Sequence, residues 1–211
     1  MDSSQADAHG ILPLAVLEAM RNLDSPSDEE AAEYVDEFLK KRLGLSTTVA
    51  AQIARYELGV RRGRPVSARE FEQVLRLAGR RPDAALVFSD GGRRAARRAL
   101  ALLPLASRWG ARYLPRLARR AVGFRGARRC LRDVFEAGLV REHGAAVALV
   151  AHRLAVRATP DGAACGFYGA AVAELLRQLA GFDGGVVHSR CCARGDERCE
   201  WRAGSLQTGG A

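Results

Sequence analysis

His188-Ser-Arg-Cys191-Cys192-Ala-Arg-Gly195-Asp196-Glu-Arg-Cys199 is the stretch that decides how the last quarter of this chain folds. It predicts a β-hairpin with strands at Gly185–Cys192 and Glu197–Arg202 and a turn around Gly195. The hairpin carries one imidazole and several thiols, and Cys165 upstream adds another thiol. Three thiolates and one imidazole form a ligand set that closes a structural zinc site. We therefore expect Zn²⁺ as a structural cofactor of this chain.

The spacing of the ligands sets a geometric condition on that site. Cys165 opens a predicted helix, Gly166–Ala180, where the helix dipole favours a thiolate. His188 and Cys191 are three residues apart, so an ideal strand places them on opposite faces. A bulge or bend near residues 189–191 is needed if Cys191 is the ligand. Spacing alone leaves the choice between Cys191 and Cys192 open.

The segment from Cys165 to Cys199 resembles the closing segment of the bacterial vinyl-4-reductase domain family. In that family a Cys opens a Gly-containing helix, and Glu-x-x-Cys and Cys-x-Ala-x-Gly-Asp-x-x-Cys follow. The positions that match at the family's spacing are Cys165, Gly166, Gly169, Cys191, Ala193, Gly195, Asp196 and Cys199. Ligand-binding domains of phenol-sensing transcription activators share this segment, and there the Cys and Glu positions bind zinc. The resemblance thus implies Cys165, His188, Cys191 and Cys199 as the metal ligands, with His188 replacing Glu.

The resemblance also implies a fold and a partner. Domains of this family are α+β, are related to transport-particle (TRAPP) subunits, form dimers and enclose an apolar pocket. Residues 84–130 are similar to the middle of stand-alone bacteriochlorophyll vinyl-reductase-like proteins, which handle a tetrapyrrole. The resemblance therefore implies a homodimer with a small apolar or aromatic ligand, and a tetrapyrrole is one such ligand.

Composition and charge narrow the class of protein. The 211 residues are 48% hydrophobic, which is typical of a globular chain, and no apolar run is long enough to span a membrane. The N-terminus lacks the basic start and apolar core of a signal peptide, so we expect a cytoplasmic protein. Five cysteines are an odd number, and four of them follow residue 164, which favours a metal or redox site over a disulfide framework.

The basic charge is concentrated in one region. Residues 91–130 contain twelve Arg and no Asp or Glu. A solvated basic face on the helices of residues 93–122 is the simpler interpretation, and an anionic partner there is the alternative. The segment from Gly44 to Arg69 contains the ingredients of a DNA-reading helix pair, but these are common, so the sequence disfavours nucleic acid as the partner.

The order of predicted elements gives an α+β fold: N-terminal helices, then a small antiparallel sheet with an inserted helix. We expect a tail and short helix in 1–24, a helical segment in 25–82, a ligand-binding domain in 83–204 and a disordered tail in 205–211. Hydrophobic periodicity predicts helices over 11–22, 25–43, 47–60, 71–77, 93–103, 111–122 and 127–142, a strand over 145–158, and a tail over 1–10.

A binding role is favoured over catalysis. The chain has no phosphate-binding Gly loop, no Gly-x-Ser-x-Gly elbow and no dinucleotide fingerprint. A zinc closed by four protein ligands has no open position for water, so we expect no catalytic residue. A zinc-stabilised sensor or carrier is the leading hypothesis, with a tetrapyrrole reductase or its accessory protein as the alternative. Core packing is the simplest role for the candidate ligand-pocket residues, which are His152, Phe135, Phe167, Tyr168 and Trp109.

Overall fold

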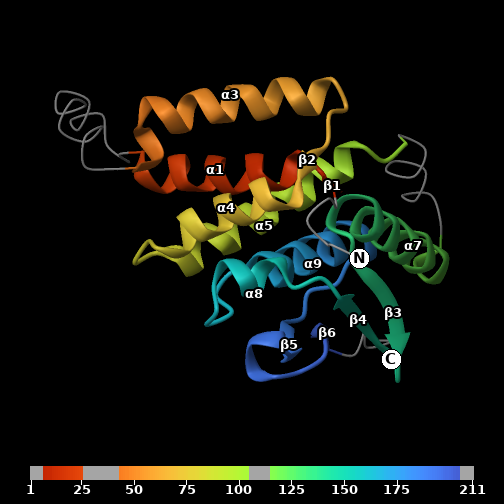
Figure 1. Ribbon diagram of the computed structural model, residues 1–211. Coiled ribbons are helices and arrows are strands. Elements are labelled where there is room, and N and C mark those ends of the chain that lie inside the picture. The colour runs from red at the N-terminus through yellow and green to blue at the C-terminus, as the bar shows by residue number, and fades with distance from the viewer. Residues whose placement is uncertain (1–6, 26–42, 105–114, 205–211) are drawn as a thin grey trace.

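The computed structural model describes residues 7–25, 43–104 and 115–204 (Figure 1). The chain is α+β, as the sequence predicts: stacked helices form one part of the molecule and a four-stranded antiparallel sheet forms the other. One continuous apolar core runs from the N-terminal helices through to the sheet. Within the described residues, no helix combines the length and the apolarity that crossing a bilayer requires.

Helix α1 (Ile11–Asp24) is the centre of the helical part. Its first ten residues are all buried, which is typical of a helix surrounded by protein. It packs against α3 (Thr47–Arg61), α4 (Ala68–Gly79) and α5 (Ala84–Ala101). A short 3₁₀ turn, η3 (Leu43–Leu45), leads into α3.

Side-chain caps define where two of these helices begin. The Ser46 hydroxyl accepts from the amide of Val49 at 3.2 Å, and the Ser67 hydroxyl accepts from the amide of Glu70 at 3.2 Å. The second contact is one half of a capping box between Ser67 and Glu70. The Glu70 carboxylate turns away from the helix end and accepts from the Tyr56 hydroxyl instead, so α3 and α4 are tied together.

Helix α9 (Cys165–Ala180) lies between α5 and α7 (Arg116–Phe135). Two glycines permit this close approach. A Cβ at Gly92 would collide with the backbone carbonyl of Phe167, and a Cβ at Gly123 would collide with that of Leu179. Because neither glycine carries a side chain, the backbones of α5 and α7 can lie close to that of α9.

The sheet has the order β3-β4-β6-β5 and is antiparallel throughout. Its strands are β3 (Gly138–Glu142), β4 (Ala145–Val150), β6 (Cys199–Ala203) and β5 (Val186–Arg190), so β5 is an edge strand. A second, two-stranded pairing joins β1 (Asp7–Ala8) to β2 (Val66–Ser67).

Three sequence predictions about the elements are wrong in part. Residues 7–8 are not tail but strand β1. The helix predicted over 127–142 ends at Phe135, because Glu136 adopts a left-handed conformation with φ of 52°, and β3 follows. The strand predicted over 145–158 ends at Val150 and is followed by helix α8 (Leu154–Ala158).

Some of the remaining predicted elements lie within the described residues and others lie outside them. His143, which directly follows the helix predicted over 127–142, forms the β3–β4 turn with Gly144, both at positive φ as a tight hairpin turn requires. The helices predicted over 11–22, 47–60 and 166–180 are present, and 93–103 is the second half of α5. Three predicted segments lie outside the described residues: nearly all of the helix over 25–43, the first residues of the helix over 111–122, and the tail 205–211.

Candidate metal centre

The structure brings the four predicted ligands to one point. One ligand atom each from Cys165, His188, Cys191 and Cys199 lies within 4.8 Å of the others. The sulfur of Cys165 is 4.0 Å from that of Cys191 and 3.9 Å from that of Cys199. Tetrahedral Zn–S bonds of about 2.3 Å separate sulfurs by roughly 3.8 Å, whereas a disulfide joins them at about 2 Å. The spacing therefore matches a metal site that could hold an ion, and not a disulfide.

Each ligand is supplied by a different local structure. Cys165 is the first residue of α9, His188 lies in β5, Cys191 precedes the 3₁₀ turn η5 (Cys192–Arg194), and Cys199 opens β6. The β5–β6 register shifts between His188 and Arg190, where Ser189 is left out of the pairing. This is the irregularity that the three-residue spacing required, and it lets His188 and Cys191 share one site.

The turn between β5 and β6 holds two of the sulfurs by backbone hydrogen bonds. The amide of Ala193 donates to the sulfur of Cys191 at 3.4 Å, and the amide of Cys192 donates to the sulfur of Cys199 at 3.4 Å. The Asp196 carboxylate accepts from the amide of Cys191 at 2.6 Å and closes the turn. Donors aimed at sulfur stabilise the thiolate form that a metal binds.

Gly162 closes the cluster from the other side. It has a φ of 79°, and a Cβ at this position would lie 3.3 Å from the sulfur of Cys191 and 3.9 Å from that of Cys165. The sequence identifies this glycine only as part of a turn. Its place beside two ligands could not be predicted, because the contact joins the loop before α9 to the hairpin.

His188 is oriented by stacking. Its ring lies 4.7 Å from the Trp201 ring at an interplanar angle of 6°. Its Nε2 atom is buried and has no hydrogen-bond partner among the described residues. A buried imidazole nitrogen without a partner is unfavourable, and a metal ion would satisfy it. The donor set and this nitrogen both fit a bound cation.

The pKa values of the cysteines describe the cluster without a cation. The pKa of Cys165 is raised, because its thiol donates a hydrogen bond to Cys199 and is buried. The pKa of Cys199 is lowered to about 3, because it accepts that hydrogen bond. The proximity of three sulfurs thus outweighs the helix dipole expected to favour a thiolate at Cys165. A divalent cation reverses this balance, since a coordinating thiol loses its proton.

The other two cysteines lie outside the cluster. Cys192 is half-buried and contributes its backbone amide to the site. Cys130 is buried in α7, where its thiol is 3.7 Å from the carbonyl of Ala99, and burial raises its pKa to about 11. Cys130 is therefore a core residue, as its helical spacing indicates.

Four of the five predicted pocket residues form one aromatic cluster. Tyr168 has ring-centroid distances of 5.5 Å to His152, 5.5 Å to Phe167 and 6.5 Å to Phe135. Tyr168 also stacks on Trp201 at 5.8 Å, so the cluster continues to His188, one of the candidate metal ligands. Trp109 lies outside the described residues.

This aromatic cluster contains two polar atoms that have no partner. The Tyr168 hydroxyl and the Nδ1 atom of His152 are buried and make no hydrogen bond to the described residues. Burial raises the pKa of Tyr168 and lowers that of His152, so both side chains are held neutral.

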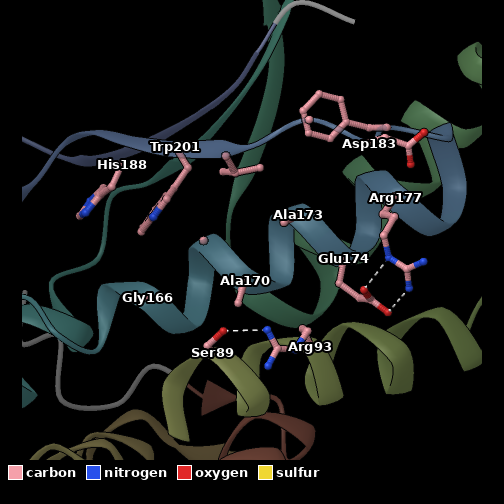
Figure 2. Close-up of a pocket in the computed structure, with 14 residues that line it drawn as sticks. Ser89, Arg93, Gly166, Ala170, Ala173, Glu174, Arg177, Asp183, His188 and Trp201 are labelled. Carbon is pink, nitrogen blue, oxygen red and sulfur yellow. Dashed lines mark hydrogen bonds and ion pairs between the residues drawn. The ribbon is translucent and has the colours of Figure 1, made fainter. Parts of the chain in front are cut away.

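A groove of about 600 Å³ runs along the exposed face of α9, beside the metal centre (Figure 2). Its floor consists of small residues, and its walls come from α5 on one side and from the β5 region on the other. Ser89 and Arg93 lie on the α5 side, and Trp201 and His188 lie on the strand side. The sequence analysis missed this groove, although its floor could have been found from the helical spacing of Gly166, Gly169, Ala170 and Ala173.

The arginines of α5 are mostly paired. Arg94 is 2.6 Å from Asp90, Arg97 is 3.0 Å from Glu174, and Arg98 pairs with Glu18. Arg93 instead donates to the Ser89 hydroxyl at 2.8 Å and has no carboxylate partner within the part of the chain that the structure describes. Much of the basic charge in this helix is therefore compensated locally, and the uncompensated guanidinium borders the groove.

Comparison of the chain with family models, with curated proteins and with solved structures gives no match.

Proposed function

We propose that this protein is a zinc-stabilised module that binds a small, mostly apolar molecule as a sensor or carrier. The observation that carries the proposal is the Cys₃His cluster, whose four ligand atoms lie within 4.8 Å of one another. Thiolates and imidazole suit zinc better than magnesium or calcium, which prefer oxygen ligands. With four protein ligands the ion has no open position, so its role is structural.

The metal would join a helix to a hairpin that follows it in the chain. Cys165 belongs to α9, whereas His188, Cys191 and Cys199 belong to the terminal hairpin. A bound ion would tie the start of the helix to both strands and fix the position of Trp201 through its stack on His188. Loss of the ion would release the hairpin, because metal binding is linked to folding.

The aromatic cluster supports the ligand-binding part of the proposal. Its rings from Phe135, Phe167 and Tyr168 offer apolar contact, and the unpartnered atoms of Tyr168 and His152 offer a donor and an acceptor. A small aromatic molecule with one polar group matches this chemistry. The ligand would contact Tyr168, which stacks on Trp201, so ligand and metal would stabilise the same strand.

Native mass spectrometry of the purified protein tests both parts of the proposal. We expect one zinc ion per chain, lost in Cys165→Ser and Cys199→Ser and retained in the matched control Cys192→Ser, whose thiol lies outside the cluster. A normally folded wild-type chain without metal would contradict the proposal. The same mass spectra show any retained small molecule and the oligomeric state. In a separate titration, a shift in the absorbance of added porphyrin would point to a tetrapyrrole as the ligand.

A further inference from the structure

The groove over α9 contains the indole N–H of Trp201, which has no hydrogen-bond acceptor among the described residues. Trp201 is only 2% exposed, yet none of the described residues accepts a hydrogen bond from its indole N–H. Gly169 lies directly against it, because a Cβ at residue 169 would be 3.0 Å from the indole nitrogen. The absence of a side chain there leaves the donor open to the groove. A donor on a buried side chain that is open to a groove and has no protein acceptor is available to a ligand atom that accepts from it.

The opposite wall of the groove supplies a positive charge. Arg93 is the arginine of α5 that has no carboxylate partner among the described residues, whereas Arg94, Arg97 and Arg98 each have one. The other charged groups of the groove already interact with one another. Glu174 accepts from Arg177 at 3.0 Å, and the remaining carboxylate, Asp183, acts on Arg177. The groove therefore has one cation available to an anionic group.

The floor between these two groups consists of small residues. In its first turns α9 contributes Gly166, Gly169, Ala170 and Ala173 to the groove, none of which has a side chain longer than a methyl group, and Glu174 and Arg177 follow at the far end. A planar ring can lie close to such a surface, with the side chain of Phe182 at the margin of the groove. Trp201 and Arg93 lie on opposite sides of the helix, whose diameter is about 10 Å, so a simple inorganic anion would not reach both (Figure 2).

We infer that this groove is a binding site for an elongated aromatic monocarboxylate, whose carboxylate pairs with Arg93 and whose far end carries an acceptor for the indole N–H of Trp201. The site is distinct from the buried aromatic cluster, which lies on the other side of Trp201 from His188. It rests on the proposed function in one respect, because His188 borders the groove and its metal would hold Trp201 in place.

The experiment uses 4-acetylbenzoate as the probe, since it carries a carboxylate at one end of a ring and a carbonyl acceptor at the other. We expect saturable binding by isothermal titration calorimetry, with at least 10-fold weaker binding of the neutral 4-acetylbenzamide. Arg93→Gln should weaken binding of the acid about 10-fold or more, because the charge-assisted hydrogen bonds to the carboxylate are lost. The matched control is Arg94→Gln on the same helix, which removes an arginine already paired with Asp90 and should leave the affinity unchanged.

A second variant probes the other wall of the groove. Gly169→Ala places a methyl group over the indole nitrogen and should abolish binding, whereas Gly59→Ala in α3, which lies outside the groove and meets no atom within 4 Å, should not. Equal affinity for the acid and the amide, or equal loss in Arg93→Gln and Arg94→Gln, would overturn the inference. A dimer that forms on this face and does not bind the acid would also overturn it.

Metal content measured on the same samples separates the inference from the proposed function. Zinc-loaded protein that does not bind the acid contradicts the inference alone. Metal-free protein that binds it with the expected dependence on Arg93 contradicts the proposed function alone.

Discussion

Helix α1 and strand β5 are held in place by different forces. The first ten residues of α1 are buried and contact helices on several sides, so its position is fixed by many small apolar contributions. Strand β5 is an edge strand with Val187 65% exposed and Ser189 and Arg190 also exposed. It pairs with β6 on one side and reaches α9 through the His188 and Cys191 end of the metal cluster. If the cluster holds a metal as proposed, the comparison predicts that α1 depends on the apolar core and β5 on the bound ion.

Removing the metal should have the largest effect on stability, and it should destabilise β5 and β6 but not α1. Structural zinc contributes about 10 kcal/mol or more in small zinc domains at neutral pH, so chelation should lower the free energy of opening the β5–β6 hairpin by several kcal/mol. Hydrogen exchange should show faster amide exchange in 186–203 and little change in α1. Equal loss of protection in α1 and β5 would show that the two regions are not independent.

A cavity in the helical core around α1 should lower the stability of the protein without changing its metal content. Leu17→Ala removes a side chain that is fully buried in α1, and we expect a loss of about 3 kcal/mol in the free energy of unfolding. Because Leu17 is in the helical core, the folded variant should keep its full metal content. Thermal or denaturant unfolding with metal analysis checks this, and a folded Leu17→Ala protein that has lost its metal would contradict the comparison.

Gly162→Ala should produce a smaller effect that is specific to the metal cluster. An alanine at a φ of 79° costs about 1–2 kcal/mol, and here its Cβ would also press on the sulfur of Cys191. Gly144→Ala is the matched control, since Gly144 has a φ of 80° and no atom within 4 Å of the added Cβ. Both variants should lose similar stability from the backbone, but only Gly162→Ala should lower zinc affinity in competition with a chelator. Equal zinc affinities would show that this loop does not shape the site.

The smallest effect concerns acid sensitivity of the aromatic cluster. Burial lowers the pKa of His152 in the folded protein below its usual 6.5, so the folded state binds fewer protons than the unfolded state. The corresponding stability is complete above pH 6.5 and is lost as the pH falls below it, with a slope of at most about 1.4 kcal/mol per pH unit. His152→Gln should reduce this slope in denaturant titrations at pH 7, 6 and 5. An unchanged slope would mean that other groups cause the acid sensitivity.

The sequence predicted the fold best where the chain is regular. The apolar run at the start of α1, the Ser67 cap and the glycine after Ala180 place helices at their observed positions. Errors occur where one residue changes the conformation. Glu136 ends α7 with a positive φ that its residue type does not favour, and the apolar run after Ala145 turns from strand to helix without a strong breaker.

The candidate site was predictable in its ligands but not in its surroundings. Thiols and imidazole are few, and the three-residue spacing of His188 and Cys191 already required the irregularity seen beside Ser189. Gly162, Trp201 and Arg93 carry no such signal, because their contacts join residues far apart in the chain. Such contacts follow from packing of whole elements, which local sequence patterns do not encode.

X-ray absorption at the zinc edge of the purified protein tests the central claim most directly. The account predicts one zinc per chain with three sulfurs at about 2.3 Å and one nitrogen at about 2.0–2.1 Å, and loss of the nitrogen in His188→Ala. Four sulfurs around the ion would mean that Cys192 has replaced His188, and a folded chain without zinc would mean that the hairpin is held without a metal.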